Sequence, residues 1–206
     1  MSNRVTELAG RVALITGAGK GAGRLLAQAF AKRGISVAAN DISPINVEQV
    51  VDQINAQGGT AKAYIEDVAK KLGAQYIIKQ VEEDFGRIDI LVNHASVEPH
   101  VPLLEIDEWD WHRVLDVNLT GTFLMTQSVG RLMRVQGGGM IINLITAAKG
   151  PGMAAGASFA ATMSGMEGFS RQATAELSPY GIRVHAVQSG EEVVNRVMAL
   201  LRKEED

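Results

Sequence analysis

The sequence contains no cysteine, and this absence removes several kinds of chemistry at once. A disulfide framework, a thiolate metal centre and a cysteine nucleophile all require that residue. Positive charge is not in excess either, since 20 Lys and Arg stand against 23 Asp and Glu. No stretch gathers the basic residues that nucleic acid or an anionic membrane attracts. We therefore expect neither as a partner.

Long hydrophobic runs are missing as well. The first apolar stretch, Val12–Ile15, is too short for a signal-peptide core or a membrane span. A chain without cysteine or such a segment suits a reducing compartment, so we expect it in the cytoplasm. With 46% hydrophobic and 21% charged residues, its composition is that of a globular protein. Its 206 residues fit one domain, residues 1–206.

Short apolar runs alternate with longer amphipathic stretches along the chain. Such alternation predicts a parallel sheet, and nearly continuous apolar strands indicate helices on both of its faces. The expected fold is α/β, a doubly wound, Rossmann-type sheet in three layers (α/β/α). The expected strands are Val12–Thr16, Ser36–Asn40, Ala61–Tyr64, Ile88–Asn93, Met140–Leu144 and Arg183–Val187. The expected helices are Gly23–Arg33, Ile45–Gln57, Ala69–Phe85, Glu108–Val135, Phe159–Ser178 and Glu191–Lys203.

A glycine-rich loop, Gly17 to Gly23, follows the first expected strand and leads into a helix. A pyrophosphate needs backbone N–H groups that point at it and no Cβ atoms in the way. Glycines before a helix N-terminus meet both needs, and the helix dipole adds positive potential. The spacing G-x-x-x-G-x-G differs from the commoner G-x-G-x-x-G, and the alternative is a flexible turn. The candidate residues are Gly17, Gly19, Lys20, Gly21, Ala22 and Gly23.

An acidic residue follows the second expected strand, since Asp41 lies 18 residues beyond Gly23. Carboxylates at this place hydrogen-bond the adenosine ribose of a dinucleotide. Strand, loop, helix, strand and acid together predict a nicotinamide dinucleotide as cofactor. Asp41 repels a 2′-phosphate, whereas Lys20 attracts one. Because Asp41 ends a rigid strand and Lys20 is long and flexible, we expect NAD rather than NADP.

Five segments carry a family pattern: Thr16 to Gly23, Asp67-Val68, Asn93-His94-Ala95-Ser96, Asp116-Val117-Asn118 and Pro179 to Val184. In this order and spacing they resemble the short-chain dehydrogenases/reductases, the family that includes the 3-oxoacyl-[acyl-carrier-protein] reductases. The resemblance runs from about Gly10 to Gly190. It implies that Asp67, Val68, Asn93 and Ala95 also lie at the cofactor, and that a helix is kinked at Asn118.

The resemblance further implies hydride transfer at a carbonyl carbon. In the family a Tyr passes the proton, a Lys four residues later lowers the phenol pKa, and a Ser polarises the substrate oxygen. The Tyr and Lys positions hold Phe159 and Met163 in this chain, and the Ser position holds Thr146. Tyr180, the only later tyrosine, has no Lys four residues on. Asn118, Thr146, Phe159 and Met163 are thus degenerate catalytic positions.

Replacement of both Tyr and Lys by apolar residues indicates a site that stayed packed after catalysis was abandoned, because a buried Lys without partners is destabilising. The alternative is a different acid in the loop after the fourth strand, and His94, Glu98 and His100 are the candidates. Solvated loop residues are the simpler interpretation of all three.

A second departure from the family lies near the end of the sequence. The family's Pro-Gly after the sixth strand is Ser189-Gly190 here, and the last expected helix follows at once. The resemblance therefore implies that the substrate lid and the family's last strand are missing. Without a lid, exclusion of water and selection of a substrate are poor.

Two functions stay open. The first is a non-catalytic, NAD(H)-binding family member that acts as a partner subunit or as a sensor of cofactor state. The second is an oxidoreductase with residual or altered activity on a carbonyl or hydroxyl substrate. A third hypothesis is a chain with no cofactor role. Helices 108–135 and 159–178 resemble those that pair in family dimers, so a homodimer or a hetero-oligomer with an active member is expected. The residues suited to close packing, there or on the chain's own sheet, are Gly121, Thr122, Met125, Ala173 and Leu177.

Overall fold

The computed structural model describes residues 8–146 and 156–202. Within them, six strands form one sheet in which every neighbouring pair runs parallel. The spatial order is β3-β2-β1-β4-β5-β6, so the order of connection reverses between β1 and β4. The strands are β1 (Val12–Thr16), β2 (Ser36–Asp41), β3 (Ala61–Ile65), β4 (Ile90–Asn93), β5 (Gly139–Ile145) and β6 (Ile182–Gln188).

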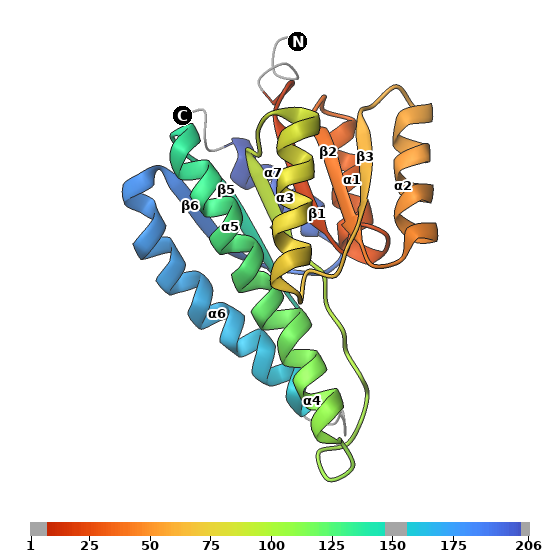
Figure 1. Ribbon diagram of the computed structural model, residues 1–206, viewed down its shortest axis with the longest axis vertical. Helices are drawn as coiled ribbons and strands as arrows, with labels where there is room; N and C mark the ends of the chain where they lie inside the picture. Colours follow the sequence, from red (N-terminus) through yellow and green to blue (C-terminus); the bar gives the residue numbers. More distant parts are fainter. Residues whose placement is uncertain (1–7, 147–155, 203–206) are drawn as a thin grey trace.

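Helices cover both faces of this sheet (Figure 1). Successive side chains of a strand point to opposite faces, so Ala13 and Ile15 of β1 enter one apolar layer while Val12 and Leu14 enter the other. The first layer contains α1 (Gly21–Ala31), α2 (Pro44–Ala56) and α7 (Val193–Arg202). The second contains α3 (Lys71–Phe85), α5 (Gly121–Gln136) and α6 (Ala157–Leu177). The predicted doubly wound, three-layer fold is confirmed.

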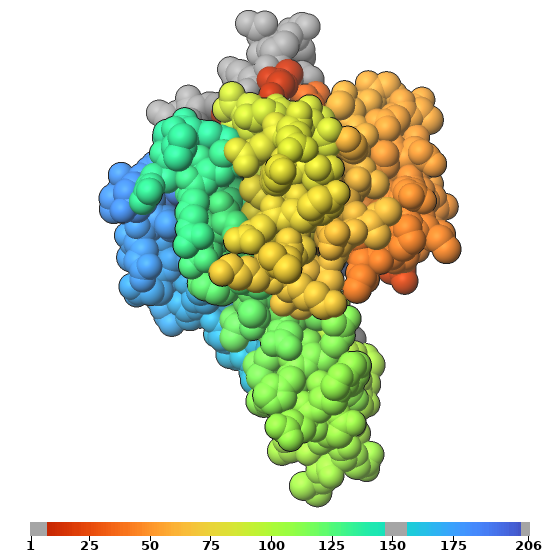
Figure 2. Space-filling model, viewed as in Figure 1, coloured from red at the N-terminus to blue at the C-terminus, as the bar shows by residue number. Residues whose placement is uncertain are grey.

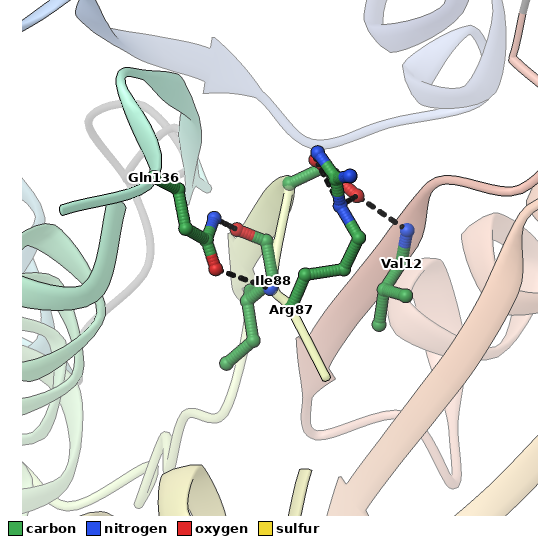
Figure 3. Close-up of polar contacts among 5 residues, drawn as sticks. Val12, Arg87, Ile88 and Gln136 are labelled. Atoms are coloured by element: carbon green, nitrogen blue, oxygen red, sulfur yellow. Dashed lines mark hydrogen bonds and ion pairs between the residues drawn. The ribbon is translucent and has the colours of Figure 1, made fainter. Parts of the chain in front are cut away.

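Polar contacts fasten the beginning of β4 to its surroundings (Figure 3). The Asp89 carboxylate accepts hydrogen bonds from the Val12 N–H at 2.9 Å and from the Arg87 Nε at 2.9 Å. The Gln136 side chain pairs with the N–H and the carbonyl of Ile88, at 3.2 and 2.9 Å. Because a side chain satisfies the backbone of Ile88, β4 begins at Ile90 and not at Ile88, where the apolar run predicted it.

The predicted continuous helix 108–135 is wrong. It consists of α4 (Glu108–Val114), a π-helical turn η1 (Leu115–Thr120) and α5. Asn118 lies in η1, where the family resemblance implied a kink. A short 3₁₀ turn, η2 (Ser178–Tyr180), follows α6. The ends of the other helices differ from prediction by no more than two residues, and Lys203 lies outside the described residues.

The carboxyl ends of β1 and β4 lie next to each other at the reversal of strand order. In sheets of this kind, loops diverge to both sides at that point and leave a crevice for a ligand. The segment that ends in α4 stands out from the body of the molecule (Figure 2). Among the helices of the described residues, none is long and apolar enough to cross a membrane.

Candidate functional site

The glycine loop connects β1 to α1 at this reversal. Gly17 has a φ of +64°, and a Cβ on it would come within 2.9 Å of the backbone N and Cα of Ala95. A Cβ on Gly23 would collide with the carbonyl oxygen of Gly17. Both positions therefore require glycine, which keeps the loop tight against the strand ends. The N-terminus of α1, at Gly21, suits an anionic phosphate group.

Asp41, the last residue of β2, faces the same loop. Its Oδ2 accepts a hydrogen bond from the Gly19 N–H at 2.9 Å, and its Oδ1 accepts one from the Ser43 N–H at 3.0 Å. A Cβ on Gly19 would lie 2.8 Å from that Oδ2, which explains the glycine at this position. The carboxylate is thus held beside the loop, where a ribose-binding acid is needed.

Asp41 lines a hollow of about 110 Å³, which we call the Asp41 hollow. Asp67 and Val68, both expected at the cofactor, line it as well. The Asp67 carboxylate accepts a hydrogen bond from the Ala69 N–H at 3.0 Å and lies 3.7 Å from the Arg113 guanidinium. An apolar wall with acidic groups at its edge suits a purine nucleoside. The full lining is Gly17, Asn40, Asp41, Ile42, Glu66, Asp67, Val68, Ala95, Ser96, Val97, Arg113 and Val117.

The segment after β4 is fixed from two sides. The Thr16 Oγ1 accepts hydrogen bonds from the N–H groups of His94 and Ala95, at 3.0 and 3.1 Å. Asn118 holds the next part, since its Oδ1 accepts from the Val97 N–H at 2.8 Å and its Nδ2 donates to the Val97 carbonyl at 3.0 Å. The π-helical turn η1 therefore serves to place Asn118 against the crevice.

The Asn93 side chain, which the family pattern placed at the cofactor, is held by other side chains of the fold. It is buried and donates to the Thr126 Oγ1 at 3.1 Å and to the Asn143 Oδ1 at 2.8 Å. The amide thereby joins β4 to β5 and α5, and it does not line the Asp41 hollow. Ala95, in contrast, lines that hollow and packs under Gly17.

On the other side of β1 from Asp41 lies a second, much smaller cavity of about 10 Å³, which we call the Met163 cavity. A water molecule alone requires about 10 to 15 Å³. Met163 and Phe159 are each only 4% exposed, and the Thr146 N–H donates to the Met163 sulfur at 3.4 Å. The lining residues are Asn93, His94, Ala95, Ser96, Leu144, Thr146, Met163 and Met166. Phe159, Met163, Met166, Ile145 and Leu119 form one apolar cluster beside it.

The candidate replacement acids are spread over different environments. His94 is half-buried and lines the Met163 cavity. Burial lowers its pKa, while the nearby Asp41 charge and a hydrogen bond to the Lys20 carbonyl act in the opposite direction. Glu98 and His100 are exposed and line neither cavity. Within the described ranges, no group of acidic or histidine side chains could hold a metal ion.

Several residues of the site carry no signal in the sequence. Thr16 is the last residue of β1, and its sequence position does not show that its hydroxyl accepts hydrogen bonds from two backbone N–H groups of the segment after β4. Arg113 of α4 lies 3.7 Å from the Asp67 carboxylate, a contact between residues far apart in the sequence.

The class of protein follows from this geometry: a parallel sheet of the order 3-2-1-4-5-6 with a glycine loop at its switch point is a dinucleotide-binding fold. The model of the short chain dehydrogenase family matches residues 11–205. The chain belongs to this family.

Relatives of known sequence span most of the chain. An uncharacterized oxidoreductase of Thermotoga maritima is 38% identical over 193 residues, 94% of this chain and 76% of the relative. A D-threitol dehydrogenase of Mycolicibacterium smegmatis is 37% identical and covers 88% of this chain and 70% of its own length. A 3-oxoacyl-[acyl-carrier-protein] reductase of Synechocystis is 38% identical, with 90% and 76% covered.

Solved structures agree in fold and differ in the cofactor they hold. An NAD⁺-bound xylitol dehydrogenase superposes with a TM-score of 0.84 at 29% identity, over 97% of this chain and 79% of that one. A metagenomic short-chain oxidoreductase in complex with NADP has a TM-score of 0.86 at 28% identity, over 94% and 90%. Nicotinamide dinucleotides of both kinds thus occur among the structural neighbours of this chain.

Proposed function

We propose that this chain binds NAD(H) and does not catalyse hydride transfer by the acid–base route of its family. The observation that carries the proposal is the burial of Phe159 and Met163 at the positions where the family pattern has Tyr and Lys. A phenyl ring and a thioether hold no transferable proton. General acid–base help contributes about 10²- to 10⁴-fold to a rate, so its loss leaves the family's reaction very slow.

The binding half of the proposal rests on the glycine loop and the Asp41 hollow. Gly17 and Gly23 let the loop pack tightly against the strand ends, and α1 supplies the helix N-terminus that suits a pyrophosphate. Asp41 supports NAD over NADP, because its carboxylate repels a 2′-phosphate. Lys20, the opposing signal, is exposed and precedes α1 as its N-cap residue.

The second candidate is an oxidoreductase with altered activity on a carbonyl or hydroxyl substrate. Two observations favour it: relatives at 37 to 38% identity carry dehydrogenase or reductase names, and His94 lines the Met163 cavity next to Thr146. His94 is the one titratable side chain among the described residues that line that cavity. Under this reading, the imidazole takes the place of the missing phenol.

Titration with NADH and NADPH, followed by a panel of carbonyl substrates, separates these candidates. We expect saturable binding of NADH, weaker binding of NADPH and no turnover by the native chain. The double variant Phe159→Tyr/Met163→Lys restores the family's proton donor and should gain turnover. Native turnover comparable with that of an ordinary reductase would overturn the proposal, and loss of that turnover in His94→Asn would establish the second candidate.

We further propose a homodimer, or a hetero-oligomer with an active family member, formed through α5 and α6. A largely apolar groove of about 330 Å³ runs between these helices and includes Phe123, Phe169, Ala173 and Leu177. Gly121, Thr122 and Met125 are instead buried against the chain's own core, so they are not available to a partner. A monomer in sedimentation at micromolar concentration would contradict the homodimer.

A further inference from the structure

His94 lies directly behind the glycine loop. Its Nε2 is 3.5 Å from the point that a Cβ on Gly21 would occupy, and its Cδ2 is 2.7 Å from the corresponding point on Gly23. The imidazole hydrogen-bonds to the backbone carbonyl of Lys20, which also accepts from the Arg24 N–H at 3.2 Å in the first turn of α1. The ring therefore touches the residues that form the positive end of this helix.

The surroundings of His94 are poor in charge. Asp41, from the end of β2, is the acidic group whose charge acts on the ring, and Lys20 faces it with its backbone carbonyl. From β5 and α6, the neighbours across the Met163 cavity are Leu144, Thr146, Met163 and Met166, none of which titrates. Burial is the largest influence on the pKa of His94 and lowers it. The positive end of α1 also disfavours a second positive charge.

We propose that His94 takes up a proton from solvent when a pyrophosphate binds at the glycine loop, so that nucleotides bind more tightly as the pH falls. This inference rests on the proposed function, because it concerns the same site. The negative charges of a pyrophosphate at the N-terminus of α1 compensate the helix dipole and favour the imidazolium form. By linkage, proton and nucleotide then strengthen each other's binding by the same factor.

Without nucleotide, burial keeps the pKa of His94 below its ordinary value, and a bound pyrophosphate raises it. Proton uptake is therefore largest between the two pKa values. Nucleotide affinity falls as the pH rises through the pKa of the complex, and it becomes independent of pH above that point.

Calorimetry with ADP-ribose and with NAD⁺ tests this coupling, because both carry the pyrophosphate and only NAD⁺ carries the nicotinamide. Titrations at about pH 6.5, in two buffers of different ionisation enthalpy, report the number of protons taken up. We expect a measurable fraction of a proton for the native chain and none for His94→Asn. His100→Asn, which removes an exposed imidazole of the same loop, is the matched control and should behave as the native chain.

NMR titration of the imidazole signals of the native chain gives an independent readout if His94→Asn does not fold. The His94 signal should move to a higher midpoint pH when ADP-ribose is added, whereas the His100 signal should not. Binding of NAD⁺ and ADP-ribose without proton uptake, or with equal uptake in His94→Asn, would overturn this inference alone. If neither nucleotide binds at any pH, the proposed function fails together with it.

Discussion

The two sides of the crevice are formed by different kinds of groups. On the side of β2, the contacts that shape the Asp41 hollow and the loop come from glycines, backbone N–H groups and one carboxylate that they hold in place. On the side of β5, Met163 and Met166 line the Met163 cavity, and they form one apolar cluster with Phe159. The first side offers about 110 Å³ and the second about 10 Å³.

The difference indicates how each side of the crevice depends on the fold. A phosphate-binding loop is part of the fold itself, since Gly17 and Gly23 also allow β1, α1 and the segment after β4 to approach each other. Proton transfer depends on single titratable side chains, and apolar residues of similar bulk can replace them without opening a cavity. The four predictions below test this contrast, beginning with the largest effect.

Truncation of the apolar cluster should damage stability and spare binding. Phe159→Ala removes a ring that is 4% exposed, and such changes cost about 3 to 5 kcal/mol of unfolding free energy. Denaturant unfolding measures this loss, and calorimetry with ADP-ribose should show unchanged affinity. Phe123→Ala is the control. The Phe123 side chain, on α5, is 41% exposed, so its removal should cost much less unfolding free energy. A large loss of ADP-ribose affinity in folded Phe159→Ala would show that the apolar cluster also contributes to nucleotide binding.

Substitution in the loop should have the opposite effect. Gly17→Ala places a Cβ 2.9 Å from the backbone of Ala95, so the loop must move and NAD⁺ affinity should fall by about 100-fold or more. Gly58→Ala is matched to it, because Gly58 also has a positive φ, of +82°, but meets no atom within 4 Å. Gly58→Ala should lose about 1 kcal/mol of stability from backbone strain, and Gly17→Ala should lose more because of its contact with Ala95. Equal NAD⁺ affinity in the two variants would contradict the proposed role of the Gly17–Gly23 loop in dinucleotide binding.

Removal of the Asp41 charge should give a smaller and more selective loss. Hydrogen bonds to a charged group contribute about 1.5 to 3 kcal/mol, so Asp41→Asn should weaken NAD⁺ binding by about tenfold or more. NADP⁺ should lose less, because the repulsion of its 2′-phosphate disappears as well. Asp52→Asn, on the exposed face of α2, is the control. An unchanged ratio of NAD⁺ to NADP⁺ affinity would show that Asp41 does not set this preference.

The smallest expected effect concerns the nicotinamide itself. Because the Met163 cavity has a volume of only about 10 Å³, the nicotinamide half should add little to binding. ADP-ribose and NAD⁺ should then have dissociation constants within about threefold of each other. Direct titrations of both ligands measure this ratio. A larger preference for NAD⁺ would mean that the β5 side opens to receive a ligand.

Sequence reasoning predicted the strands and the position of the glycine loop far better than the contacts between side chains of the site. The glycine loop, Asp41 and the six strands are local patterns, and period-two and helical spacing express them directly. The apolar spacing did not show the π-helical turn at Leu115–Thr120, because one extra residue in a turn leaves that spacing nearly intact, and only the family resemblance implied a kink at Asn118.

Contacts between distant segments were beyond prediction. The pairing of Arg113 with Asp67 and the packing of His94 against Gly23 join residues that are separated by whole strands and helices. The family pattern led us to expect Phe159 and Met163 in place of Tyr and Lys, but the sequence did not show that the Thr146 N–H donates to the Met163 sulfur. Such contacts depend on the register of β5 and the position of α6, which no local spacing encodes.

Saturation-transfer NMR on NAD⁺ in the presence of the native chain compares the two sides in one measurement. The method reports which ligand protons contact the protein. We expect strong transfer to the adenine protons and little transfer to the nicotinamide protons, as the contrast between the Asp41 hollow and the Met163 cavity requires. Equal transfer to both rings would contradict the central claim that this chain holds a dinucleotide by one half only.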